Sequence, residues 1–279
     1  MSNLTDNASI RRRAWSLTKE HFGVLFLMML IVALVPSVAS AVLLGLSGLV
    51  TSSSAGLGVV LTIVCSLALV LLTTALALGY QNAVLKLIRG NEISVGDVFS
   101  RMDCAFKGFL LTLFIGLRMW LWALPGMAVM VIGALFGEST IVFFSLVGAI
   151  VIYALMIPAA FRYCMAVPAL ADNPELGVLD AFNKSKEIMN GRKWTFFKLI
   201  FVIVLIIMLA AFALGLLTAL LGQRLVLVVI LSIASLLLSL AAGLVIEVAT
   251  LIFYNQLIGG PSGDEASPEK EEANQSYQY

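Results

Sequence analysis

The feature that most constrains this chain is a series of apolar runs, each long enough to cross a lipid bilayer. A spanning helix needs about 20 mostly apolar residues, because the hydrocarbon layer is about 30 Å thick and each helical residue rises about 1.5 Å. Six runs meet this requirement: Phe22–Leu46, Gly58–Tyr80, Gly108–Phe136, Ile141–Val167, Trp194–Leu221 and Leu225–Tyr254. The sequence therefore predicts an all-α fold, a polytopic transmembrane helix bundle of about six spans.

The composition agrees with this fold. Hydrophobic residues make up 61% of the 279 residues and charged residues only 12%, whereas soluble domains carry roughly 45–50% apolar and about 25% charged residues. The excess apolar surface must face lipid. We expect a basic cytoplasmic segment over residues 1–21, a transmembrane domain over 22–258 and a disordered, acidic cytoplasmic tail over 259–279.

Three of the runs contain a proline, at Pro36, Pro125 and Pro158, and we expect these helices to be kinked. The third run is interrupted further by Arg118, so it could instead form two half-helices or a re-entrant segment. Because Phe109–Leu117 alone is too short to cross the bilayer, a continuous kinked helix is the favoured interpretation.

Lysine and arginine are unevenly distributed between the two ends of the runs. Of the 17 in the chain, Arg224 alone falls in a connection on one side, and Arg118 and Arg162 fall within runs. All the others fall on the side that holds the two termini. Because cytoplasmic loops carry the excess of these residues, we expect both termini to be cytoplasmic.

An alternative for the first run is a cleavable signal peptide, made of Arg11–Arg13, the apolar Phe22–Val35 and the small residues Ala39–Ala41. The apolar run continues past this point, whereas the apolar region of a signal peptide normally has about 7–15 residues. An uncleaved first helix is the favoured interpretation.

Two cytoplasmic connections share the pattern Val-x-Asp-x-Phe, at Val95–Phe99 and Val178–Phe182. Apolar residues recur there at helical spacing, which is typical of an amphipathic helix at the membrane interface. Ser94 and Asp97 resemble a capping box. The chain can be divided into three units, each an interfacial helix followed by an out-and-back pair of spans, as in many transporters. Alternatively, the similarity reflects only the basic linkers that any hairpin membrane protein needs.

Three ionisable residues are candidate intramembrane sites: Arg118, Arg162 and Glu247. Each costs about 2.5–3.5 kcal/mol on insertion scales and is therefore expected to be paired, to reach the interface or to be functional. In the functional interpretation, Glu247 pairs with Arg118 or Arg162 and forms a gate or an ion-linked site. In the structural alternative, Arg162 extends to the interface and a Glu247–arginine pair only fixes the helix register.

Residue types that carry chemistry are sparse. Cys65, Cys104 and Cys164 are too far apart for a cysteine-only zinc site or a disulfide framework, and His21 is the one histidine. The sequence also lacks the common nucleotide-binding, zinc-hydrolase and serine-nucleophile motifs. We therefore expect no catalytic, cofactor-binding or metal-binding residues and no enzymatic activity. The net charge of +1, without a basic soluble face, predicts no nucleic-acid partner.

The segment from Ala171 to Phe197 resembles a known family. Ala171–Glu175 (Ala-Asp-Asn-Pro-Glu) is followed by Ser185, Met189, Gly191 and Lys193 at the spacing Ser-x-x-x-Met-x-Gly-x-Lys. Further matching landmarks are Val95–Phe99, Trp120, Pro125–Gly126 and Phe253–Leu257. Over most of residues 8–258 the chain is similar to a bacterial family of integral membrane proteins, domain-of-unknown-function family number 975. This resemblance implies a bacterial cell-membrane location and no particular activity.

The leading functional hypothesis is a non-enzymatic scaffold, regulator or membrane subunit of an assembly. Its partners would be the lipid bilayer and other membrane or cytoplasmic proteins, which the amphipathic connections and the acidic tail suit. The alternative is a transporter or permease for a small or lipid-like solute; a lipid-modifying membrane enzyme ranks third, because it needs clustered polar groups facing one pocket. A polar cavity lined by Arg118 and Glu247 near the midplane would favour transport, and a solidly packed bundle would favour a scaffold.

Overall fold

The computed structural model describes residues 7–53, 55–221 and 225–260, and this part of the chain is helical and contains no strand. Its six long apolar helices confirm the predicted all-α fold with about six spans. They are α2 (Phe22–Ser53), α3 (Ala55–Ile88), α4 (Ala105–Leu135), α5 (Glu138–Tyr163), α8 (Lys193–Leu221) and α9 (Leu225–Leu257). The shorter elements are α1 (Asn7–Glu20), the 3₁₀ turns η1 (Val95–Phe99) and η2 (Met102–Cys104), α6 (Ala166–Asp172) and α7 (Val178–Ile188).

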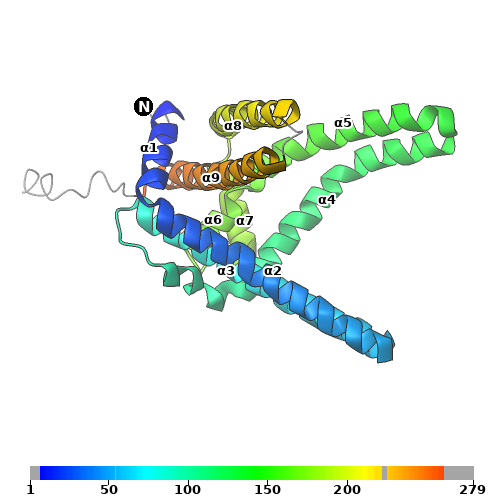
Figure 1. Ribbon diagram of the computed structural model, residues 1–279, viewed down its shortest axis with the longest axis horizontal. Coiled ribbons are helices and arrows are strands. Elements are labelled where there is room, and N and C mark those ends of the chain that lie inside the picture. Colours follow the sequence, from blue (N-terminus) through cyan, green and yellow to red (C-terminus); the bar gives the residue numbers. More distant parts are fainter. Residues whose placement is uncertain (1–6, 54, 222–224, 261–279) are drawn as a thin grey trace, which may run out of the picture.

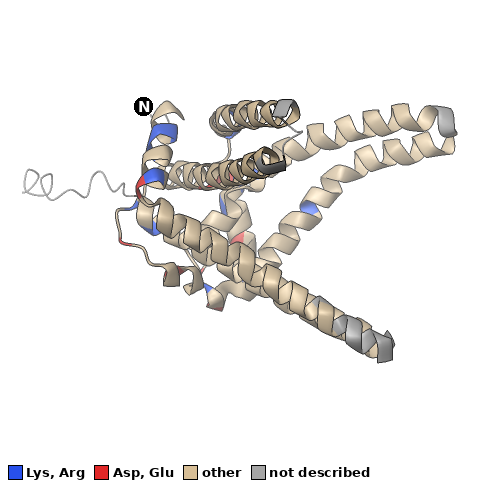
Figure 2. Cartoon of the chain, in the orientation of Figure 1, with Lys and Arg blue, Asp and Glu red and all other residues tan. Residues whose placement is uncertain are grey.

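The long helices form three hairpins, α2–α3, α4–α5 and α8–α9, which meet at one end and diverge toward their tips (Figure 1). The end where they meet is called the base here. Helix α1 and the end of α9 both lie at the base, with α6 and α7 between the hairpins. Along the chain, shorter helical elements precede each hairpin: α1 comes before α2–α3, η1 and η2 before α4–α5, and α6 and α7 before α8–α9. Lysine, arginine and acidic residues gather around the base, and the outer parts of the hairpins are almost free of them (Figure 2).

The long helices exceed the thickness of a bilayer. Helices α3, α4 and α9 have 34, 31 and 33 residues, which corresponds to about 45–50 Å at 1.5 Å per residue, against about 30 Å of hydrocarbon. These helices are therefore longer than one untilted crossing requires, which tilting or extension beyond the hydrocarbon layer would accommodate. Helix α3, for example, continues past Tyr80, where hydropathy alone ended the second span.

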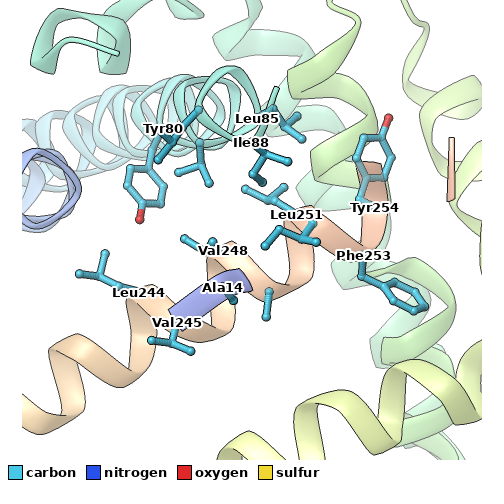
Figure 3. Packing of buried hydrophobic residues seen from close by; sticks show 14 of the residues in the cluster. Ala14, Tyr80, Leu85, Ile88, Leu244, Val245, Val248, Leu251, Phe253 and Tyr254 are labelled. Carbon is cyan, nitrogen blue, oxygen red and sulfur yellow. The ribbon is translucent and has the colours of Figure 1, made fainter. Parts of the chain in front are cut away.

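The protein core lies at the base. Buried side chains from α1, α3 and α9 pack there, including Ala14, Leu85, Leu251 and Tyr254 (Figure 3). Toward the tips the apolar side chains are exposed; only 6–17% of the most apolar window in each span is buried inside the protein. Lipid or other membrane proteins must cover that surface, since water cannot.

Close packing depends on glycine in both the first and the second hairpin. In the second hairpin, Gly126 of α4 lies directly against Gly148 and Ile152 of α5, so that a Cβ at Gly126 would overlap both. In the first hairpin, the backbone carbonyl of Val98 in η1 lies on Gly79 of α3, where a Cβ would occupy the same space. Small residues at such contacts allow backbones to approach closely, as is common between membrane helices.

The third span is one continuous helix. Helix α4 passes through both Arg118 and Pro125 without a break, as the favoured interpretation expected, and the half-helix alternative is wrong. Pro36 and Pro158 likewise lie inside the continuous helices α2 and α5. The acidic tail from residue 261 onward, expected to be disordered, lies outside the described residues.

For the first of the two segments, the prediction of an amphipathic α-helix is wrong. Instead of an α-helix, residues from Val95 onward make the two 3₁₀ turns η1 and η2. The Asp97 carboxylate accepts hydrogen bonds from the Ser94 backbone N–H at 2.8 Å and from its hydroxyl at 3.2 Å, which closes a tight turn. Val98 is buried against Gly79, whereas Phe99 is exposed. The second segment forms the α-helix α7, as predicted.

We expect Gly79→Ala to lower the thermal unfolding temperature of the detergent-purified protein, because the added methyl group meets the Val98 backbone and not a movable side chain. Overpacking of this kind costs about 1–3 kcal/mol. The control is Gly116→Ala on α4, where a Cβ would meet nothing within 4 Å. That variant should be neutral or more stable by up to about 1 kcal/mol, through helix propensity. Equal effects of the two substitutions would contradict the packing interpretation.

Candidate functional site

A polar cluster at the base connects the first hairpin, α6 and the third hairpin. It consists of Arg89 at the end of α3, Asp172 at the end of α6, and Tyr254 and Asn255 on α9, and is called the base junction here. The Arg89 Nη1 atom lies 2.7 Å from Asp172 Oδ1, and Arg89 Nε donates to Asn255 Oδ1 at 3.0 Å. The Tyr254 hydroxyl donates to Asp172 Oδ2 at 3.3 Å. One guanidinium therefore joins the end of the first hairpin to α6 and to the third hairpin.

The base junction is largely shielded from solvent. Tyr254 and Asn255 are buried, and the Arg89 and Asp172 side chains are only 24% and 16% exposed. A charge that is moved out of water is stable only when it is paired and hydrogen-bonded, and here each member has at least one partner within the junction. The junction thus specifies one arrangement of the segments that it joins.

Four further polar contacts tie the turns η1 and η2 and the adjoining residues to this region. Lys86 of α3 forms an ion pair with Asp97 at 2.7 Å. The Arg101 guanidinium donates to Asn82 Oδ1 from Nη2 and to the Ala171 carbonyl from Nε, each at 3.0 Å. Asn82 Nδ2 in turn donates to the Ser100 hydroxyl at 3.0 Å. The connection between the first and second hairpins is therefore fixed on both α3 and α6.

Glu247 is separated from both candidate arginines. It lies on α9 and its Oε1 atom accepts a hydrogen bond from Gln81 Nε2 of α3 at 3.0 Å. Within residues 7–53, 55–221 and 225–260, the ion pairs do not include Glu247. The expected pairing of Glu247 with Arg118 or Arg162 is therefore wrong. Charges of both signs within the spans could be found from the sequence, but which helices are neighbours could not.

Arg118 and Arg162 instead line one pocket, together with Lys186 of α7. This cationic pocket has a volume of about 460 Å³ and is completed by Leu121, Trp122, Pro125, Tyr163 and Phe182. It lies between α4, α5 and α7. Its described lining contains three cationic side chains and no carboxylate.

Aromatic side chains support two of these cations. The Arg118 Cζ atom lies 5.5 Å from the ring centre of Phe114, and Lys186 Nζ lies 4.4 Å from that of Phe182. The Phe114 and Phe182 rings meet edge to face at 4.7 Å, and Tyr163 stacks on Phe182 at 4.6 Å. Aromatic faces attract cations, so these contacting rings favour the observed positions of both Arg118 and Lys186.

Helix α7 is fixed in place by Ser185. Its hydroxyl donates to the Arg162 carbonyl at 3.0 Å and accepts from the Met165 backbone N–H at 3.2 Å. These are the backbone groups left open where α5 ends and α6 begins, and Ser185 itself is fully buried. Helix α7, which forms one side of the cationic pocket, is therefore held against the junction of α5 and α6.

The sequence pointed to Arg118 and Arg162 but missed Lys186 and the base junction. The signal for the junction was nevertheless present, because Asp172, Tyr254 and Asn255 all fall within the motifs that carried the family resemblance. Those motifs were interpreted as landmarks without a role. In the part of the chain that is described, the histidines, cysteines and acidic residues form no group of three or more that could hold a metal ion.

We expect Asp172→Asn to reduce stability by about 2–3 kcal/mol, because it leaves the Arg89 guanidinium partly buried without its counter-charge. Thermal unfolding in detergent would measure this, with Asp103→Asn on the exposed surface of η2 as a control that should be close to neutral. Combining Asp172→Asn with Arg89→Gln should cost less than the sum of the two single changes. Simple additivity would show that the ion pair does not hold the hairpins together.

A comparison with known protein families matches residues 1–260 to the model described as "Protein of unknown function (DUF975)". Comparisons with curated proteins and with solved structures give no match. The family match covers both the base junction and the cationic pocket, together with all six long helices. The chain therefore belongs to the DUF975 family.

Proposed function

We propose that this protein is a non-enzymatic membrane scaffold, a subunit or regulator that holds other membrane proteins against its diverging hairpins. The observation that carries the proposal is the distribution of packing. The three hairpins are bound to one another at the base and separate toward their tips, where large apolar side chains such as Leu135, Val142 and Phe212 are exposed. Such a shape presents several apolar helical surfaces within the membrane while the base keeps them in fixed positions.

The polar groups also favour a structural role over a catalytic one. Asp172 and Asp97 are each engaged in an ion pair, and Glu247 accepts a hydrogen bond from a neutral amide. A general base or nucleophile needs a free reacting atom and an orienting neighbour directed at a substrate. Carboxylates whose contacts link one segment to another suit a structural role, as in a scaffold, better than a catalytic one.

Transport is supported less well. A transporter places its site near the midplane between repeats, commonly where helices are broken. Here Arg118 and Glu247, the residues expected to line such a site, belong to separate places in the fold, and α4 is unbroken. A scaffold was expected to be packed solidly throughout, whereas this bundle is packed solidly only at the base. Packing at the base alone still serves that role, because the tips remain available to partners.

We further propose that the base faces the cytoplasm of a bacterial cell, with both termini on that side. The support is the concentration of lysine and arginine around the base (Figure 2), in the sense of the positive-inside rule.

The orientation can be tested with reporter fusions in a bacterial host. Green fluorescent protein fused after residue 260 should fluoresce, and alkaline phosphatase at that position should be inactive. At Gly137, in the tip between α4 and α5, the expectation is reversed: alkaline phosphatase should be active and green fluorescent protein should not fluoresce. Active phosphatase at residue 260 would contradict a cytoplasmic base.

The scaffold proposal can be tested by site-specific photocrosslinking in living cells. A photoreactive residue at Leu135 or Val142, on the same hairpin tip, should yield an adduct with one and the same membrane protein, identified by mass spectrometry. The control is the same residue at Leu85, which is buried in the base, and which should give no such adduct. If the tip positions label only lipid, while the purified protein in liposomes shows solute-dependent flux, the transporter alternative replaces the scaffold.

A further inference from the structure

The cationic pocket gathers three positive charges without a negative one. Arg118, Arg162 and Lys186 come from three different helices and line a single space of about 460 Å³, a volume within the usual range for small-ligand sites. Like charges that share a site repel one another, and proteins normally relieve this repulsion with a neighbouring carboxylate. Arg118 and Arg162 are exposed, and no carboxylate is present among the described lining residues, so the site is open to an anion from outside the chain.

The donors of the two arginines are available to such an anion. Across the described ranges, neither the Arg118 nor the Arg162 guanidinium donates a hydrogen bond to the protein or belongs to an ion pair. Arg118 contacts the face of Phe114, which leaves its N–H groups open. Lys186 donates one hydrogen bond, to Asn183 Oδ1 at 2.9 Å, and an ammonium group has three donors.

The position of the pocket along α4 indicates where the anion lies. From Arg118 to Leu135, the last residue of α4, the helix rises about 26 Å, close to the thickness of the hydrocarbon layer. With the end of α4 placed at the opposite boundary, Arg118 would lie near the boundary on the base side, at the depth of lipid headgroups. Trp120 and Trp122 are both exposed next to it, and exposed tryptophan is enriched at that depth. Leu121 and Pro125 continue the pocket lining along α4 in the direction of the hydrocarbon.

We propose that the cationic pocket binds the phosphate group of an anionic phospholipid from the leaflet on the base side. The planar guanidinium groups of Arg118 and Arg162 suit the paired oxygens of a phosphate, and the Lys186 ammonium adds a third charge-assisted contact. Basic pockets between membrane helices are a recurring means of selecting anionic headgroups. The site ties α4, α5 and α7 to one lipid and is independent of whether the hairpin tips hold protein partners.

The test uses the full chain, purified in detergent and titrated with phosphatidylglycerol, with bound lipid counted by native mass spectrometry. Phosphatidylcholine and inorganic phosphate are titrated in parallel. The variants are Arg118→Gln/Arg162→Gln and, separately, Lys186→Gln. The matched control is Lys184→Gln/Arg192→Gln, which removes the same charge as the first variant from residues that do not line the pocket. Thermal unfolding without lipid verifies that each variant is folded.

Wild type and the control should retain phosphatidylglycerol with similar affinity. Loss of both arginines should weaken binding roughly tenfold or more, since a hydrogen bond to a charged group contributes about 1.5–3 kcal/mol and each 1.4 kcal/mol is tenfold. If the double variant does not fold, a loss of affinity in Lys186→Gln carries the same conclusion. If inorganic phosphate competes as effectively as the lipid, the ligand is a soluble phosphate and the lipid assignment fails. Equal binding by pocket variants and control would overturn the site altogether.

Discussion

The ion pair between Arg89 and Asp172 is the interaction on which the remainder of the structure depends. Within a bilayer, apolar helices gain little by packing on one another, because lipid chains satisfy their side chains equally well. A protein made of three apolar hairpins therefore needs polar or sterically specific contacts to hold them in one arrangement. The base junction supplies these contacts where the helices leave the hydrocarbon, with Tyr254 and Asn255 bringing in the third hairpin. Beyond the junction, the Gln81–Glu247 hydrogen bond still joins α3 and α9, and toward their tips the hairpins diverge.

The two polar regions of the protein have opposite electrostatic character. At the base junction a cation and a carboxylate neutralise each other, and the neighbouring Lys86–Asp97 pair repeats this pattern. In the cationic pocket, Arg118, Arg162 and Lys186 meet without a counter-charge from the described chain. The first arrangement is complete within the protein, and the second needs a component of its surroundings. One group of residues thus stabilises the fold, and a separate group binds a component of the surroundings.

Sequence reasoning predicted the spans well and the site poorly, for physical reasons. A bilayer imposes length and hydropathy on each helix separately, so the six long helices could be found from local composition. Which helices are neighbours depends on long-range contacts, and for this reason Glu247 was assigned an arginine when its partner is Gln81. The segment from Val95 was expected to be an α-helix because its spacing is helical. The contact of Val98 with Gly79 and the hydrogen bonds to Asp97 give tighter turns instead.

The order in which these contacts can form has a consequence for biogenesis. Helix α1 is synthesised first, yet Ile10 and Ala14 are buried in a core whose other members come largely from α3 and from α9, the last helix to emerge. Arg89 and Asp172 likewise precede Tyr254 and Asn255 by a whole hairpin. Until the final span has been inserted, the nascent chain therefore displays an uncovered amphipathic N-terminal helix and an incomplete ion-pair cluster. Closure of the base would therefore distinguish chains that contain α9 from chains truncated before it, which quality-control proteases could recognise by that exposed surface.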